Sequence, residues 1–143
     1  MALLNPYLNF GGTTRDAMEF YQSVFGGQLD VSSFADFQMP GIDPGEANLI
    51  MHSQLSTPSG FTLMAADLPA SMGTVPDTSN ITVSLSGSEA DELRGYWDKL
   101  AEGGQVTMPL DRAPWGDYFG ELIDKFGVKW LMNITGGGAP DAG

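Results

Sequence analysis

Residues 20–29 read FYQSVFGGQL, and residues 96–106 read YWDKLAEGGQV, which is the same pattern with an insertion. Each stretch has two adjacent aromatic residues, the rest of a helix, a Gly-Gly-Gln step and an apolar residue typical of a strand. A hydroxyl residue followed three positions later by an acid precedes each copy, at Thr13 and Asp16 and at Ser88 and Asp91. This spacing is typical of a helix N-cap, and the glycines are typical of a helix end. The sequence therefore predicts two related helices.

Apolar residues recur at helical spacing in both segments, so each helix is expected to bury one face. They are Ala17, Phe20, Tyr21 and Val24 in the first, and Leu93, Trp97 and Leu100 in the second. Strand patterns surround both helices. They are Pro6–Phe10, Leu29–Phe34, Asn48–Leu55 and Phe61–Ala66 in the first half, and Ile81–Leu85, Gln105–Pro109, Tyr118–Ile123 and Val128–Ile134 in the second.

The order of elements is therefore β-α-β-β-β twice, with Leu68–Ser79 as a linker. We predict an α+β fold in which the two βαβββ modules share a cupped mixed sheet with helices outside, leaving a concave face for a ligand. A single domain is expected over residues 1–135, with module one at about 4–67, module two at about 79–135, and a flexible tail at 136–143. The alternative is an α+β domain in which two glycine-ended helices arose by chance.

The amino-acid composition argues against several kinds of partner and of metal site. The chain has 143 residues, 18 acidic against 6 basic side chains and a net charge of −12. Because six scattered cations cannot neutralise a row of phosphates, nucleic acid and anionic membranes are not expected partners. No apolar run is long enough to span a membrane and no cation precedes Arg15, so we expect a soluble, cytoplasmic protein. Cysteine is absent and His52 is the only histidine, which excludes thiolate and two-histidine metal sites within one chain.

Several blocks of the sequence carry a resemblance to a known family. They are Pro6–Phe10, Phe20-Tyr21, Phe25–Gly27, Ile50–His52, Leu63-Met64 with Asp67, Met108–Leu110, Trp115-Gly116, Phe119-Gly120 and Asp124–Trp130 with Asn133. Together they resemble the PhnB-like branch of the vicinal oxygen chelate superfamily, the glyoxalase, bleomycin-resistance and dioxygenase group. The resemblance implies a paired βαβββ fold, a cupped pocket for a small molecule and, usually, a homodimer.

Metal-dependent members of that group place four His, Gln or Glu ligands on the first and fourth strand of each module, where a divalent ion acts as a Lewis acid on two substrate oxygens. At those positions this chain offers Asn5, Asn80, Ala65 or Ala66, and Leu131. Leucine cannot bind a metal, so we expect no metal and no other cofactor. The alternative is a divalent-metal lyase or dioxygenase that binds its metal through residues at other positions, such as His52 with Asp67 or Glu121.

Three polar candidates for the site come from the first module. His52 is the only side chain whose unperturbed pKa lies near neutrality, so it is the candidate catalytic base and ligand contact. Strict alternation over Asn48–Leu55 would place it on one face with Ile50 and Gln54. Tyr7 and Asn9 share a face of the first strand and are expected to bind a ligand through hydroxyl and amide groups. All three have a structural alternative, as packing, turn or solvent-facing residues.

The remaining candidates are more varied. Asp67 is expected to orient a ligand or His52, or else to cap the turn at Leu68. Met64 is one of several methionines, with Met39, Met51, Met72, Met108 and Met132, that would line an adaptable pocket or fill the core. Trp115, Tyr118 and Phe119 lie in a glycine-bracketed loop after Arg112, which would close over a planar ligand or serve as a packing loop.

The sequence therefore predicts a metal-independent, small-molecule binding protein of the PhnB-like group. Two alternatives stay open. One is the metal-dependent lyase or dioxygenase, and the other is a dimerising interaction module with a vestigial pocket.

Overall fold

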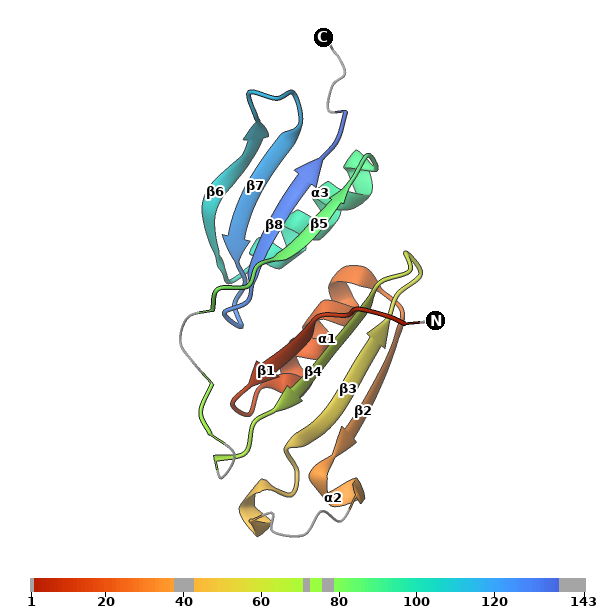
Figure 1. Ribbon diagram of the computed structural model, residues 1–143, viewed down its shortest axis with the longest axis vertical. Coiled ribbons are helices and arrows are strands. Elements are labelled where there is room, and N and C mark those ends of the chain that lie inside the picture. Colours follow the sequence, from red (N-terminus) through yellow and green to blue (C-terminus); the bar gives the residue numbers. More distant parts are fainter. Residues whose placement is uncertain (1, 38–42, 71–72, 76–78, 137–143) are drawn as a thin grey trace. The chain divides into compact units, whose positions relative to one another are not determined.

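The computed structural model describes residues 2–37, 43–70, 73–75 and 79–136, so Met39, Met72, part of the predicted linker and the tail after Gly136 lie outside it. The chain divides into two compact units, Met1–Pro76 and Asp77–Gly143, which we call the N-unit and the C-unit (Figure 1). No helix in the described part of the chain is long and apolar enough to cross a membrane.

The N-unit is a four-stranded mixed sheet with one long helix. Its strands lie in the order β1-β4-β3-β2, with β1 parallel to β4 and the other pairs antiparallel. A short helix α2 (Phe34–Phe37) and a 3-10 turn (Pro44–Glu46) lie between β2 and β3. The main elements are β1 (Tyr7–Phe10), α1 (Thr14–Phe25), β2 (Gln28–Ser33), β3 (Ile50–Ser56) and β4 (Thr62–Asp67).

The C-unit repeats this plan. Its strands lie in the order β5-β8-β7-β6, and only the β5-β8 pair is parallel. Its elements are β5 (Val83–Gly87), α3 (Ala90–Ala101), β6 (Gln105–Arg112), β7 (Tyr118–Ile123) and β8 (Lys129–Ile134). The prediction of an α+β fold built from two βαβββ modules is confirmed.

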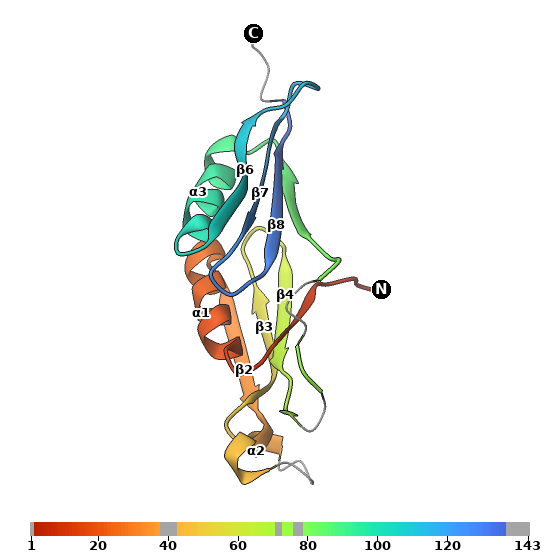
Figure 2. The ribbon, with the colours of Figure 1, turned by 90° about the vertical axis from the view of Figure 1, so that its left-hand side faces the viewer.

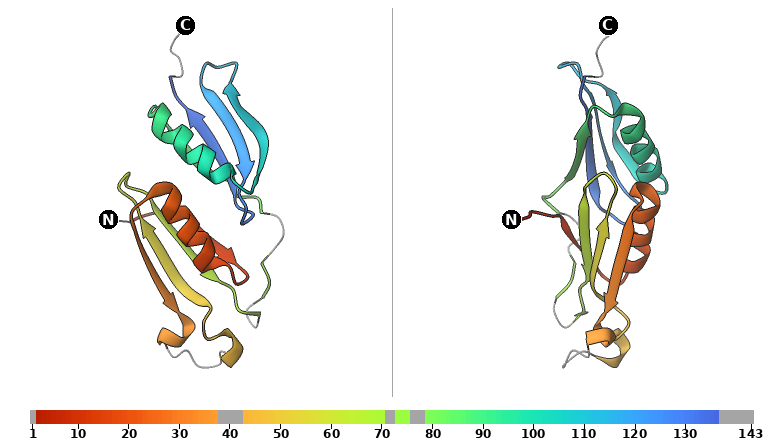
Figure 3. Two further views of the ribbon diagram at one scale, coloured as in Figure 1. Left: turned by 180° about the vertical axis from the view of Figure 1, so that it is seen from behind. Right: turned by 90° about the vertical axis from the view of Figure 1, so that its right-hand side faces the viewer.

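In each unit the long helix covers one face of its own sheet, as Figures 2 and 3 show for α1 and α3. The predicted apolar positions of α3 are buried, together with Tyr96. On α1 the prediction is correct for Ala17, Tyr21 and Val24, whereas Phe20 is half-buried and Met18 is fully buried instead. Burial of these side chains against the sheet is the main source of stability for both units.

Two strand ends differ from the prediction for local reasons. Strand β2 ends at Ser33 rather than Phe34, because Ser33 and Asp36 form a reciprocal pair of hydrogen bonds that starts α2. The Ser33 amide donates to Asp36 at 2.8 Å, and the Asp36 amide donates to the Ser33 hydroxyl at 3.2 Å. Strand β6 continues past Pro109 to Arg112. Proline is tolerated there because β6 is an edge strand, where one row of amides has no partner to lose.

The predicted caps of the long helices are wrong in detail. Thr13 precedes α1, but its side chain makes no capping hydrogen bond. Instead, Asp67 at the end of β4 accepts from the amides of Gly12 and Thr14, at 2.9 and 3.1 Å, and from the Thr14 hydroxyl at 2.7 Å. In the C-unit the residue before α3 is Glu89 rather than Ser88, and it too makes no side-chain cap.

The repeated Gly-Gly pairs end both helices as predicted, and the structure shows why each pair has a second glycine. Gly26 and Gly103 have positive φ angles, 74° and 73°, which glycine adopts without strain. A Cβ on Gly27 would overlap the carbonyl oxygen of Ser56, and one on Gly104 would overlap that of Ile123. The second glycine therefore lets the chain pass close to the end of a neighbouring strand.

Candidate functional site

Strand alternation divides the N-unit sheet into a face against α1 and an open face. Leu55, Leu63 and Ala65 are buried on the helix side. The strand register places the opposite set in two cross-strand rows. One row is Tyr7, Met64, Gln54 and Asp30, and the other is Asn9, Ala66, His52 and Ser32. We call this surface, together with Met51, the N-face. Four of the predicted site residues lie on it, namely Tyr7, Asn9, His52 and Met64.

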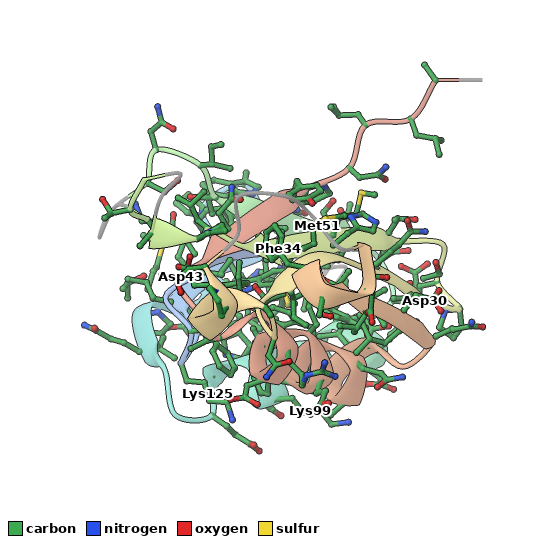
Figure 4. All side chains as sticks on the ribbon, turned by 90° about the horizontal axis from the view of Figure 1, so that it is seen from below. Asp30, Phe34, Asp43, Met51, Lys99 and Lys125 are labelled. Carbon is green, nitrogen blue, oxygen red and sulfur yellow. The ribbon has the colours of Figure 1, made fainter. Side chains whose placement is uncertain are left out.

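A β-bulge shapes the N-face at His52. The register pairs Ser32 with His52 but Ser33 with Ile50, so Met51 is an extra residue in β3. The bulge interrupts the alternation: Ile50 and Ser53 are buried, whereas Met51 and His52 are both half-buried. The prediction that Ile50 shares the face of His52 is therefore wrong. Figure 4 shows Met51 on the side of the sheet away from α1. Gln54 shares the face of His52 as alternation predicts, whereas Met51, named among the possible pocket methionines, reaches this face only because of the bulge.

Tyr7 and His52 are in direct contact on the N-face. The Tyr7 hydroxyl lies 3.3 Å from His52 Nδ1, and the ring centroids are 6.0 Å apart. Tyr7 lies on β1 opposite Met64 of β4, and His52 lies on β3 one row further, so their side chains meet across β4. Tyr7 remains 47% exposed. Among the described residues, Nε2 of His52 has no hydrogen-bond partner, so that nitrogen is available to a ligand.

The contacts of Asp67 differ from those of Tyr7 and His52, because they are hydrogen bonds within the fold. Besides the three hydrogen bonds at the start of α1, its second oxygen accepts from the Ile50 amide at 2.9 Å. The side chain is 5% exposed. One carboxylate thus joins the ends of β3 and β4 to the first turn of α1, and we assign it a positioning role rather than a ligand contact.

The C-unit has an equivalent open surface, which we call the C-face. Gly120 and Leu122 of β7 point toward α3, because a Cβ on Gly120 would lie 2.8 Å from the Trp97 ring and Leu122 is fully buried. The alternate positions and their cross-strand partners form the C-face. They are Ser84, Ser86, Met108, Phe119, Glu121, Leu131 and Asn133.

The predicted aromatic loop is divided between the two sides of the C-unit sheet. Trp115 is 62% exposed and lies edge-on to Phe119, with ring centroids 5.6 Å apart. Tyr118 lies on the helix side, where the Arg94 guanidinium of α3 is 4.8 Å from its ring centroid. The structure brings Trp115 and Phe119 together and separates Tyr118 from them, because adjacent residues of a strand point to opposite faces.

The metal-ligand positions can be compared through the parallel strand pairs. Tyr7 pairs with Met64 in β1 and β4, and Ser84 pairs with Leu131 in β5 and β8. Ser56 and Ile123 are equivalent, because each lies against the second glycine of its module, and they pair with Thr62 and Lys129. Two residues further along each strand, Leu131 therefore corresponds to Met64, not to Ala65 or Ala66 as the sequence predicted. Neither Met64 nor Leu131 offers the oxygen or imidazole donor that a divalent ion prefers. Within the described residues, no three His, Cys, Asp or Glu side chains form a group able to hold a metal. The side chains present do not fit the four-ligand site.

Comparison with known proteins agrees with the repeated fold. The sequence model of the Glyoxalase/Bleomycin resistance protein/Dioxygenase superfamily matches residues 4–132, so the chain belongs to this superfamily. Among its relatives, protein YjdN of Escherichia coli K12 is 28% identical over 142 residues, covering 92% of this chain and 95% of that protein.

Two solved structures are similar over most of the chain. Protein PA1353 of Pseudomonas aeruginosa is 31% identical, with a TM-score of 0.79 and coverage of 99% of this chain and 100% of that one. The PhnB protein of Bacillus cereus, described as a putative 3-demethylubiquinone-9 3-methyltransferase, is 26% identical, with a TM-score of 0.73 and coverage of 94% and 100%. The predicted resemblance to the PhnB-like group is confirmed.

Proposed function

We propose that the protein binds a small organic molecule on the N-face without a metal ion. The observation that carries this proposal is the contact between the Tyr7 hydroxyl and His52 Nδ1. Tyr7 either donates to Nδ1 or accepts from it, so the contact favours one orientation of the imidazole and leaves Nε2 free to bind. Asn9 adds an amide, and Met51 and Met64 add adaptable apolar surface beside it.

The charge of the N-unit limits what this surface binds. Arg15 is the only Lys or Arg in residues 1–76, and it belongs to α1, which covers the other face of the sheet. The N-unit itself therefore supplies no permanent cation on the N-face to pair with a carboxylate or phosphate. Its affinity is expected to come from hydrogen bonds to Tyr7, Asn9 and His52 and from apolar contact.

Substituting Tyr7 by Phe is expected to weaken ligand binding about fivefold to twentyfold, because one hydrogen-bonding group and the orientation of His52 are lost. Since Tyr7 is partly exposed, unfolding should change by less than about 1 kcal/mol. A thermal-shift screen with cationic, neutral and anionic aromatic metabolites would first identify a ligand, which at 100 times Kd adds about 2.7 kcal/mol of stability.

Titration of Y7F and of the control E19Q, which alters an exposed residue of α1, would then test the site. Equal affinity of Y7F and the unmodified protein would contradict the proposal, and the absence of any stabilising ligand would favour an interaction module with a vestigial pocket.

Removal of divalent metal is expected to leave ligand affinity and Tm unchanged, because Met64 and Leu131 supply no donors at the paired strand positions. Elemental analysis before and after dialysis against EDTA, followed by the same titration, measures this. Stoichiometric zinc, nickel or iron whose removal abolishes binding would instead support the metal-dependent lyase or dioxygenase. The homodimer that the family implies also stays a prediction, and light scattering of the purified chain would test it.

A further inference from the structure

Glu121 occupies a central position on the C-face. Its neighbours in β7, Gly120 and Leu122, point toward α3, so the Glu121 carboxylate points away from the helix. The register places Glu121 between Met108 of β6 and Leu131 of β8. The side chain is half-buried. A carboxylate thus lies between two apolar side chains, where water solvates it less well than on an open surface.

The cationic side chain nearest to this position by register has another partner. Lys129 lies on the same face of β8, opposite Ile123, but its Nζ donates to the Ser79 carbonyl at 2.9 Å. Within the described part of the chain, Glu121 has no ion-pair or hydrogen-bond partner. Its negative charge is therefore available to a positively charged group from outside.

An aromatic surface lies next to the carboxylate. Phe119 is two residues from Glu121 in the same strand, so it shares its face at a spacing of roughly 6.5–7 Å. Trp115 lies edge-on to Phe119 and leaves much of its own surface exposed. Aromatic faces bind apolar rings and also attract cations.

We infer that the C-face is a binding site for an organic cation with an apolar ring, in which Glu121 pairs with the charged nitrogen and Phe119 and Trp115 contact the ring. This inference goes beyond the proposed function, because it assigns a second binding surface, in the other unit, and the charge class of the molecule that binds there. The N-unit position equivalent to Glu121 is the neutral Gln54, since each lies opposite the corresponding β4 or β8 residue. At this position of the repeat, the C-unit therefore has a carboxylate where the N-unit has a neutral amide.

Three probes with the same ring and different charge test the inference. They are 2-phenylethylammonium, 2-phenylethanol and 3-phenylpropanoate, titrated at pH 7 into the full-length chain and followed by amide chemical shifts. The ammonium is expected to shift the amides around Phe119, Glu121 and Leu131 and to bind more tightly than the other two. In E121Q its Kd is expected to rise about fivefold, which is the loss of one partly screened ion pair, while that of the alcohol stays unchanged.

The control E102Q removes the same charge from an exposed position after α3, so it distinguishes a local contact from the general field of an acidic protein. Equal loss in E102Q and E121Q, preferential binding of the propanoate, or no shift of C-face amides with any probe would overturn the inference. Shifts confined to Tyr7, His52 and their neighbours would overturn it while leaving the proposed function standing. An unchanged amide spectrum of E121Q without probe shows that the variant is folded.

Discussion

Substitution of Asp67 by alanine is expected to lower the free energy of unfolding by about 3–5 kcal/mol, which is a large fraction of the stability of a domain this size. The carboxylate accepts four hydrogen bonds, from Gly12, Thr14 and Ile50. Alanine would leave the amide donors without their partner in a buried position, and water cannot easily replace it. The start of α1 would also lose the negative charge that favours a helix N-terminus.

Urea unfolding of D67A and of the control D98A, an exposed acid on α3, measures the difference. D98A is expected to change stability by less than about 0.5 kcal/mol. D67N is an informative intermediate, because it retains an oxygen acceptor for the α1 amides but presents an NH2 group in place of the second oxygen. If D67A unfolds at the same urea concentration as D98A, the positioning role of Asp67 is incorrect.

Substitution of Gly27 by alanine is expected to destabilise the protein by about 2–4 kcal/mol. Two costs add. Gly27 has φ = 100°, which an L-residue adopts only with strain. Its Cβ would also overlap the Ser56 carbonyl oxygen and approach the Thr57 Cα at 2.8 Å, so the backbone at the end of β3 would have to move.

Two further glycine variants serve as comparisons for G27A. G11A is the control, because a Cβ there would meet nothing within 4 Å, and its stability should stay within about 0.5 kcal/mol. G104A has the equivalent steric overlap with Ile123, again against backbone rather than a movable side chain. Thermal or urea unfolding of the three variants measures the effects. Equal stability of G27A and G11A would contradict the close approach at the second glycine of the repeat.

The sequence was sufficient for the repeated βαβββ order because each helix has a local apolar period and a local glycine end. It was not sufficient for the start of α1. The group that caps this helix is Asp67, 53 positions from Thr14, and no local pattern connects them. The Ser33–Asp36 pair is different, since its spacing is visible in the sequence and predicts the end of β2 once it is read as a helix start.

In the candidate site, too, local sequence patterns predict some features, and others depend on residues far apart in the chain. Strand alternation alone places Tyr118 and Phe119 on opposite faces of the sheet. The prediction missed this because it treated both residues as part of one aromatic loop. The bulge at Met51 could not be predicted, because it depends on how β3 pairs with β2. The contact between Tyr7 and His52 joins residues 45 positions apart and depends on the parallel pairing of β1 with β4.

A ligand is expected to bind at the Tyr7–His52 pair without a metal. Because His52 is the only histidine, a long-range 1H–15N spectrum of the EDTA-treated protein contains the signals of a single imidazole ring. Addition of the stabilising ligand from the screen is expected to shift the Nε2 signal of His52, and Y7F is expected to reduce that shift. A His52 spectrum that stays unchanged at saturating ligand would contradict the account.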